Sequence, residues 1–358
     1  MGICASKTNT STVNPSDLSI TNFSQDEEIV DGYKLSQSFL NKYELLLSDD
    51  GSPDIIGHGS FSKVFKCRNR ITSESFALKY VDMEQIASRG AEAVERTKKE
   101  VRRGVSVLIT LHHESIINLE DYYESPNTMC VVLELAGMEL YDHVVEQGKL
   151  TEGECATILR SIAEGVCFMH EKNLVHRDLK PENVVLGVNN TWKIIDFGFS
   201  RVIESKLSRM KSFVGTMNYV APEVVERKEY KSSVDVWSIG VISFVLLVGY
   251  LPFNTSSPEE REKHEYQVSF RSKHWDKISF AAKTFVARCL SKDPEDRPTT
   301  NELLEMSFLN MKMHRQRRES KLPLASPTRL KNMVEGSVKI EDDDDDEDGN
   351  GSTTVSPR

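Results

Sequence analysis

Apolar and polar positions divide the chain into a polar start, a long globular middle and a polar end. The first residues, up to about residue 40, are rich in Ser, Thr and Asn and show no sustained period, which favours a flexible leader. From Tyr43 to about Leu309 apolar residues recur throughout, and a basic patch and an acidic run follow. We therefore expect a leader over residues 1–42, a globular domain over 43–309 and a disordered tail over 310–358.

Within the globular stretch, the hydrophobic period changes from strand-like to helical. Residues 54–67 alternate polar and apolar side chains around glycines, which predicts a hairpin with a glycine-rich tip. Residues 91–111 have a helical pattern. Residues 239–253 are the most hydrophobic stretch, but it is interrupted by Gly and Pro and is shorter than the roughly 20 residues that cross a bilayer. We expect a buried core helix there.

The negative charge of the chain is concentrated near its end. The formal net charge is −10, yet residues 341–348 carry eight negative side chains, which leaves about −2 elsewhere. Because no basic stripe is present, we expect no nucleic-acid partner. The acidic run begins like a calcium loop, but its twelfth position is Val355 instead of a bidentate Glu, so we expect a solvated charge block.

The cysteines show no C-x-x-C spacing. The six are Cys4, Cys67, Cys130, Cys155, Cys167 and Cys289. This scatter argues against a disulfide framework or a zinc site and favours a reducing compartment. The first twenty residues also lack the apolar segment of a secretory signal.

Two short motifs carry candidate chemistry. Residues 175–183 read VHRDLKPEN, and residues 196–198 read DFG. Phosphoryl transfer needs a carboxylate that orients and deprotonates a hydroxyl, for which Asp178 is suited, and ligands for Mg²⁺, for which Asn183 and Asp196 are suited. Every position of the pattern H-R-D-L-x-x-x-N is filled, and the chain therefore resembles the eukaryotic protein kinases.

This resemblance implies a fold, a reaction and cofactors. The family has an α+β, bilobal fold with a small β-rich N-lobe and a large, mostly helical C-lobe. It transfers phosphate from ATP, with Mg²⁺, to hydroxyls of protein substrates. By the resemblance Lys180 would touch the γ-phosphate, and Thr216 would bond Asp178 and Lys180. Both residues are typical of the serine/threonine branch, so we expect a serine/threonine kinase in intracellular signalling.

Further motifs resemble one group within that family. Glu223, in A-P-E, would pair with Arg297, and Asp235 would support the catalytic loop. Residues 249–253 and 274–279 resemble the calcium/calmodulin-dependent protein kinase group.

The resemblance also implies a nucleotide site. Residues 76–79 read FALK, which resembles the strand whose lysine bridges the α- and β-phosphates. At the hinge, the Glu134 carbonyl and the Ala136 amide would meet adenine, and Leu133 would be the gatekeeper. The expected nucleotide contacts are Ile56, Gly57, His58, Gly59, Ser60, Phe61, Ser62, Val64, Ala77, Lys79, Glu100, Glu134, Ala136 and Val185. The apolar members of this set are equally explicable as ordinary core residues.

The glutamate that pairs with Lys79 in the family is not at its usual place. Counting back nine residues from His113, the family's offset, leads to Gly104. Glu100 lies one turn earlier on the same helical face, about 6 Å along the axis. We favour Glu100, brought to the site by an extra turn, and Glu95 or no ion pair are the alternatives.

Specificity and control are implied at three positions. Glu139 and Glu182 match family positions whose carboxylates recognise arginines three and two residues before the phosphorylated serine. The chain contains such a sequence itself, with Arg209 three residues before Ser212. Phosphate on Ser212 would pair with Arg177 and order the activation segment.

The ends of the chain carry two further signals. Residues 1–6 fit the pattern M-G-x-x-x-[ST], which indicates myristate on Gly2, and Cys4 offers a palmitate site. Because one myristoyl chain binds only marginally, two lipids would hold the protein on the cytoplasmic face of a membrane. The basic residues after Leu309 are a candidate calmodulin site.

A different class of function is an acylated pseudokinase that acts as a scaffold. It is motivated by Gly104 and by Ser62, which replaces the third glycine of the family's loop. The lysine, the base and both metal ligands are intact, and this favours an active kinase.

Overall fold

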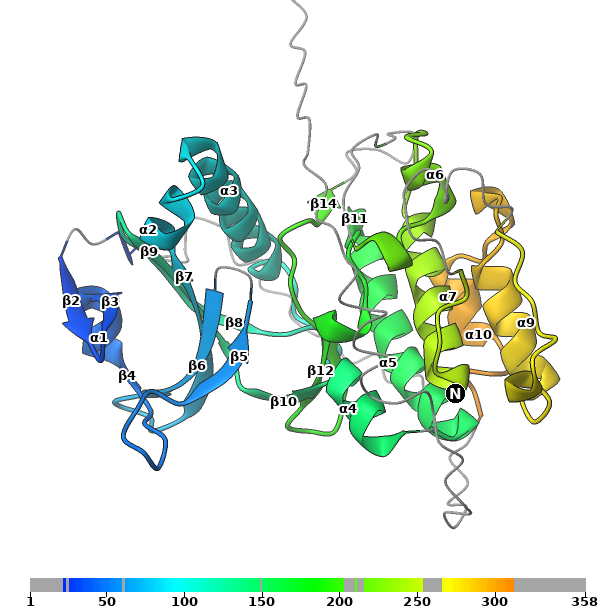
Figure 1. Ribbon diagram of the computed structural model, residues 1–358, viewed down its shortest axis with the longest axis horizontal. Coiled ribbons are helices and arrows are strands. Elements are labelled where there is room, and N and C mark those ends of the chain that lie inside the picture. Colours follow the sequence, from blue (N-terminus) through cyan, green and yellow to red (C-terminus); the bar gives the residue numbers. More distant parts are fainter. Residues whose placement is uncertain are drawn as a thin grey trace, which may run out of the picture. The chain divides into compact units, whose positions relative to one another are not determined.

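The structure is a computed structural model that describes residues 22–23, 26–59, 62–148, 150–202, 210, 216–253 and 266–311. These residues form two compact units. The first comprises the described parts of residues 1–143, 160–169 and 181–200, and the second comprises the described parts of the rest. The first unit is rich in strands and the second is mostly helical (Figure 1). The predicted α+β, bilobal fold is confirmed.

A seven-stranded sheet is the centre of the first unit. The strands follow the order β1-β8-β9-β7-β6-β4, and β5 pairs with β6. Their bounds are β1 (Asn22–Phe23), β4 (Tyr43–Leu45), β5 (Ile55–His58), β6 (Ser62–Asn69), β7 (Ser75–Asp82), β8 (Leu119–Glu124) and β9 (Thr128–Glu134). All pairs are antiparallel except β1 with β8. The predicted hairpin is thus β5 and β6.

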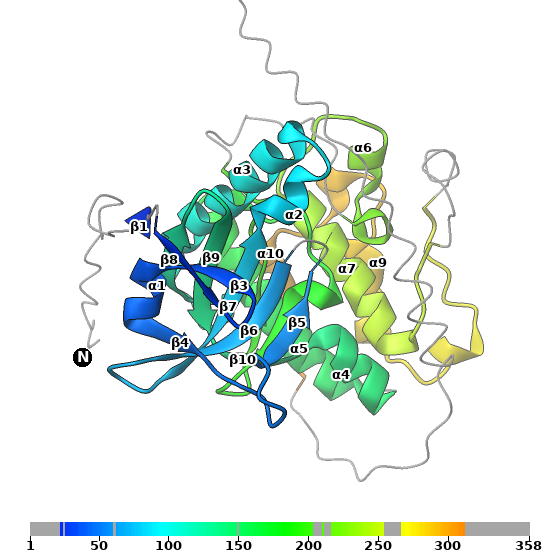
Figure 2. The ribbon, with the colours of Figure 1, turned by 60° about the vertical axis from the view of Figure 1, so that its left-hand side comes forward.

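Both faces of this sheet are buried. Successive side chains of a strand point to opposite faces, and on β9 Cys130 and Val132 join one apolar cluster while Met129 and Val131 join another. The second cluster lies under α2 (Met83–Ala87) and α3 (Ala91–Leu108), which pack beside the sheet in Figures 1 and 2. The helix predicted over residues 91–111 is confirmed, and it ends at Leu108.

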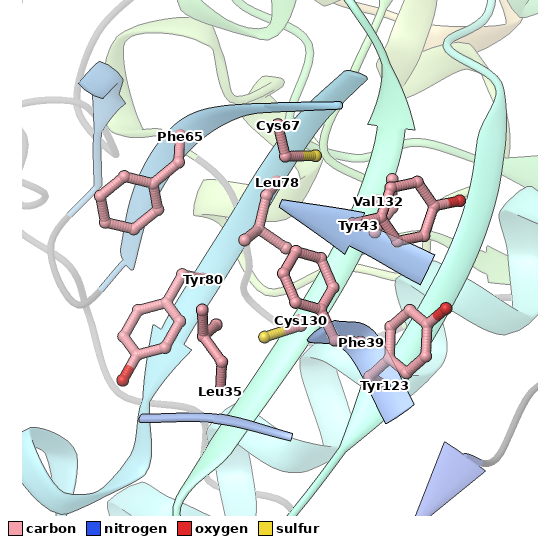
Figure 3. Packing of buried hydrophobic residues seen from close by; sticks show 10 residues of the cluster. All are labelled: Leu35, Phe39, Tyr43, Phe65, Cys67, Leu78, Tyr80, Tyr123, Cys130 and Val132. Atoms are coloured by element: carbon pink, nitrogen blue, oxygen red, sulfur yellow. The ribbon is translucent and has the colours of Figure 1, made fainter. Parts of the chain in front are cut away.

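The other cluster is covered by a segment that the sequence placed in a flexible leader. This N-terminal segment, residues 26–42, forms β2 (Glu27–Val30), β3 (Tyr33–Ser36) and α1 (Gln37–Lys42). Leu35 and Phe39 are fully buried and belong to the same cluster as Tyr43. In Figure 3, Leu35 lies beside Tyr80. Phe39 stacks on Tyr43 with ring centroids 5.4 Å apart and meets Tyr123 edge-on at 5.6 Å.

The prediction of a flexible leader up to residue 42 is therefore wrong for the N-terminal segment. Two four-residue strands and a six-residue helix are each too short to produce a recognisable period. The segment is also held by polar contacts, since Ser36 caps α1 and Lys34 pairs with Glu84 of α2 at 2.5 Å.

Three smaller sheets complete the strands of the described residues. In the first unit β10 (Ala136–Glu139), β12 (Val184–Gly187) and β13 (Trp192–Ile194) pair antiparallel, and η1 (Pro181–Asn183) precedes β12. In the second unit β11 (Leu174–Val175) pairs with β14 (Arg201–Val202). The remaining sheet is β2 with β3.

Helices make up most of the second unit. Its long helix is α7 (Ser233–Val248), in which every residue after Ser233 is buried. The core helix predicted over residues 239–253 is confirmed as far as Val248, and Gly249 ends it. The glycine at 240 lets α9 approach α7, because a Cβ there would lie 2.6 Å from that of Cys289. The other elements of this unit are η2 (Met217–Tyr219), α6 (Pro222–Val225), η3 (Lys273–Trp275), α9 (Phe280–Cys289), η4 (Pro294–Asp296) and α10 (Thr300–Glu305).

Two more helices contribute residues to both units. They are α4 (Leu140–Gln147) and α5 (Glu152–Glu171). Among the helices of the described residues, none has the length and apolar character needed to cross a membrane.

Candidate active site

The catalytic loop of the second unit is fixed by a buried carboxylate. Asp235 of α7 is fully buried and accepts hydrogen bonds from the backbone N–H groups of His176 and Arg177, both at 2.9 Å. It also lies 2.9 Å from Nε2 of His170. Burial by itself raises the pKa of Asp235, but the hydrogen bond and charge of His170, the charge of His176 and the backbone N–H of Arg177 together outweigh it, and the net pKa is lowered. The support predicted for Asp235 is therefore present.

Arg177 shows why this loop needs such support. Its φ is +71°, in the left-handed region that costs a non-glycine residue about 1 kcal/mol or more. Its guanidinium donates to the hydroxyl of Tyr230 at 3.2 Å, and its side chain is buried. The loop is thus held in a strained conformation by partners on both its backbone and its side chain.

The structure brings together the three residues predicted to act around the attacking hydroxyl. Oδ1 of Asp178 accepts hydrogen bonds from the backbone N–H and the Oγ1 of Thr216, at 2.8 and 2.9 Å. Nζ of Lys180 lies 3.2 Å from Oδ2 of Asp178 and donates to Oγ1 of Thr216 at 2.7 Å. A carboxylate oriented in this way, beside a positive charge, is suited to accept a proton from a substrate hydroxyl.

A second predicted ion pair anchors the region after Thr216. Arg297 donates to both carboxylate oxygens of Glu223, at 2.6 and 2.7 Å, and both side chains are buried. The guanidinium also stacks over Trp237, 5.0 Å from the ring centroid. A bidentate, buried pair of this kind fixes orientation as well as distance.

The predicted metal ligands lie in the first unit. Asn183 ends η1, and its carbonyl accepts the N–H of Ile195 at 2.9 Å, which ties it to the segment of Asp196. Asp196 has φ +60°, and its Oδ2 lies 3.5 Å from Nζ of Lys79. The structure therefore places Lys79, Asn183 and Asp196 in one compact unit.

The donor set fits Mg²⁺ better than a metal that needs a protein cage. Mg²⁺ is usually held by one or two carboxylates together with substrate phosphates and water. Within the described residues no group of three or more His, Cys, Asp or Glu side chains could hold a metal. One carboxylate, Asp196, and one amide, Asn183, are what a nucleotide-bound Mg²⁺ requires.

The tip of the β5–β6 hairpin is shaped by its glycines. Gly57 pairs with Val64 and His58 with Lys63, while the N–H of Gly59 donates to the carbonyl of Ser62 at 2.7 Å. A Cβ at Gly59 would collide with Oγ of Ser62. The hydroxyl of Ser62, the residue that departs from the family pattern, would have to rotate away from such a Cβ. Ser60 and Phe61 lie outside the described residues.

The apolar residues among the predicted nucleotide contacts come from two sheets of the first unit. Ala77 on β7 lies opposite Leu133 on β9. Ile56 on β5 is 45% exposed, although it is a large apolar side chain. The two other members of this group are Val64 on β6 and Val185 on β12.

Helix α3 packs directly on the segment that carries Asp196. A Cβ at Gly104 would lie 3.4 Å from the backbone nitrogen of Gly198, and the Cβ of Glu100 faces the same glycine. Arg103, which sequence reasoning did not single out, donates to the carbonyl of Gly198 at 3.4 Å. Glu100 and Gly104 therefore share one helical face, as predicted. The ion pair that the structure records for Lys79 is with Asp196, so the Lys79–Glu100 pair stays a prediction.

Several predicted residues cannot be placed in this site. Gly2, Cys4 and Ser212 lie outside the described residues, as does the basic patch after Leu309. Their predicted roles stay predictions.

Comparison with known proteins decides the family. The model of the protein kinase domain matches residues 52–309. The chain belongs to the protein kinase family. Two relatives are named calcium/calmodulin-dependent protein kinases. Type 1 from Caenorhabditis elegans is 36% identical over 266 residues, covering 72% of this chain and 73% of its own, and type IV from Homo sapiens is 35% identical over 264 residues, covering 72% and 53%.

A third relative extends the comparison. The serine/threonine-protein kinase DCLK3 from Mus musculus is 34% identical over 269 residues, covering 73% of this kinase and 33% of its own chain. These matches confirm the predicted protein serine/threonine kinase and its resemblance to the calcium/calmodulin-dependent group. The N-terminal segment lies outside the region that matches the family model.

Proposed function

We propose that this kinase phosphorylates serine or threonine preceded by arginines and works from the cytoplasmic face of a membrane. In the transfer, the substrate hydroxyl oxygen bonds to the γ-phosphorus of ATP, the bond to the bridging oxygen breaks, and ADP leaves. Asp178 accepts the hydroxyl proton, and Lys180 steadies the transferred phosphate. Asn183 and Asp196 would hold Mg²⁺, which neutralises phosphate charge.

The observation that carries the specificity is the contact between β10 and η1. Glu139 ends β10 and Glu182 lies within η1, and the two elements contact each other in the first unit. Both glutamates are partly exposed, with Oε2 of Glu182 buried. Two carboxylates on adjoining elements form a surface that favours the guanidinium groups of a substrate, since charge-assisted Arg–carboxylate contacts are strong and directional.

Peptide kinetics test this specificity. Replacing Arg at position −3 or −2 of a basic peptide by Ala should lower kcat/KM for the wild-type enzyme by roughly 10-fold or more, the worth of one charged hydrogen bond. Glu139→Ala and Glu182→Ala should each remove the penalty at one arginine. Glu92→Ala, at an exposed site on α3, is the matched control. Equal use of all peptides by the wild-type enzyme would contradict the proposal.

The membrane location rests on residues 1–6 alone. Gly2→Ala should release the protein from membranes, and Cys4→Ser should leave weak, reversible binding, because stable anchoring usually takes two lipids. Cell fractionation measures both, with Ser11→Ala, outside the M-G-x-x-x-[ST] motif, as a control. Membrane-bound Gly2→Ala protein would rule out the lipid anchor and leave the kinase assignment untouched.

A further inference from the structure

A buried lysine behind the predicted hinge has no role in the chemistry described so far. Lys193 on β13 is 5% exposed. Its Nζ lies 2.9 Å from Oε1 of Glu134 and 3.5 Å from the carbonyl oxygen of Ile116. Moving an ammonium out of water costs several kcal/mol, and an apolar pair of similar volume often stabilises a fold as well or better. Stability alone therefore does not explain why this position carries a charge.

The partner of Lys193 is fixed where the chain leaves the large sheet. Glu134 is the last residue of β9. Its backbone N–H donates to the carbonyl of Asn118 at 3.0 Å, and its side chain accepts the N–H of Asn118 at 2.8 Å. The Lys193 ammonium thus acts on a carboxylate whose residue is already bonded twice to Asn118, the residue before β8. Main chain and side chain of Glu134 are held together.

The path of the lysine stem is kept open by a glycine. An ideal Cβ at Gly187 would lie 2.7 Å from Cε and 3.0 Å from Cδ of Lys193. Gly187 also faces Ala136 across the β10–β12 pair, and its N–H donates to the carbonyl of Thr191 at 2.9 Å. Gly187 therefore leaves room for the methylene groups of Lys193 and also pairs with Ala136 between β10 and β12.

We propose that Lys193 is a positioning residue for nucleotide binding. Glu134 and Ala136 are the residues whose backbone carbonyl and amide are expected to bond adenine, and Lys193 and Gly187 hold this stretch between β9 and β12. Lys193 acts through Glu134 and does not contact ATP. The proposal rests on the assignment of ATP binding to this hinge.

Kinetic and stability measurements on a set of variants show whether Lys193 positions the hinge or only stabilises the fold. Lys193→Met should raise KM for ATP by roughly 3- to 10-fold, the worth of one oriented hydrogen bond, with kcat within about 2-fold. It should also lower Tm, because Glu134 keeps a charge that has lost its partner. In Lys193→Met with Glu134→Gln, Tm should recover while KM stays raised. Lys277→Met, at an exposed site, should change neither.

The outcomes test the role of Lys193 separately from the assignment of ATP binding to the hinge. A lower Tm with an unchanged KM would make Lys193 purely structural and overturn the proposal, as would recovery of KM in the double variant. A wild-type protein that neither phosphorylates basic peptides nor gains Tm with MgATP would instead defeat the nucleotide assignment itself.

Discussion

The catalytic loop around Asp178 and the N-terminal segment are held in opposite ways. The loop is held by hydrogen bonds and charges, with Asp235 bonding two backbone amides and Arg177 kept in a left-handed conformation. The N-terminal segment is held by apolar packing, with Leu35 and Phe39 fully buried (Figure 3). Few residue types can do the work of the loop, whereas many apolar residues could fill the same core. This difference explains why the catalytic loop could be predicted from sequence motifs and the N-terminal segment could not.

The largest expected effect separates the two regions by function. Asp178→Asn should lower kcat by about 10²- to 10⁴-fold, because the amide cannot accept the hydroxyl proton. Tm and ATP affinity should remain near wild type. Single-turnover phosphorylation and thermal unfolding measure both. Asp276→Asn, at an exposed position, is the control. Phosphorylation near the wild-type rate would remove Asp178 from its role.

The next largest effect should appear in stability alone. Phe39→Ala deletes a fully buried ring and should lower the free energy of unfolding by about 3–5 kcal/mol. Activity of the remaining folded enzyme should be close to normal. Ile29→Ala, in the same segment but 68% exposed, should change stability by no more than about 0.5 kcal/mol. Equal urea midpoints for the two variants would show that the segment does not belong to the core.

A third prediction concerns α3, which packs against the segment that carries the predicted metal ligand Asp196. Gly104→Leu would force a side chain against the backbone of Gly198, next to Asp196. Overpacking costs about 1–3 kcal/mol, and here it should appear as a raised KM for MgATP as well as a lower Tm. Ser106→Leu, on the exposed face of the same helix, is the matched control. If both variants had normal KM values, close packing at Gly104 would not matter for the metal ligand.

The smallest effect is a change in pH dependence that should be seen only in acid, in addition to the stability that Asp235→Asn should lose at every pH by weakening the support of the catalytic loop. The pKa of Asp235 is lower in the fold than its ordinary value of 3.8, so the unfolded chain binds the proton more readily. Its contribution to stability is present above about pH 4 and is lost as pH falls through the lowered pKa. Below about pH 4, the free energy of unfolding of Asp235→Asn should therefore change less with pH than that of the wild-type protein. Phe39→Ala should shift the whole curve without changing that slope, which urea titrations at several pH values would show.

The parts of the fold and site that could be predicted are those with a distinctive pattern. The cluster of Asp178, Lys180 and Thr216 follows from short motifs, and the buried helix α7 follows from the strong hydrophobicity of its sequence. The partner of Lys79 did not follow, because Gly104 offered no carboxylate and the choice of Glu100 depended on an assumed extra turn.

Lys193 could not have been found from the sequence. A lysine in a short strand is ordinarily a solvent-facing residue, and its burial depends on a glycine six positions earlier and a glutamate on another strand. Such tertiary contacts leave no local signal.

The burial of Leu35 and Phe39 determines where a self-sufficient kinase fragment begins. A fragment cut at residue 52, where the match to the family model starts, would lose both side chains together with Tyr43. The faces of Leu78, Tyr123 and Val132 that they cover would then be exposed to solvent and would favour aggregation. The boundary that matters for proteolysis and for recombinant expression is therefore near residue 26.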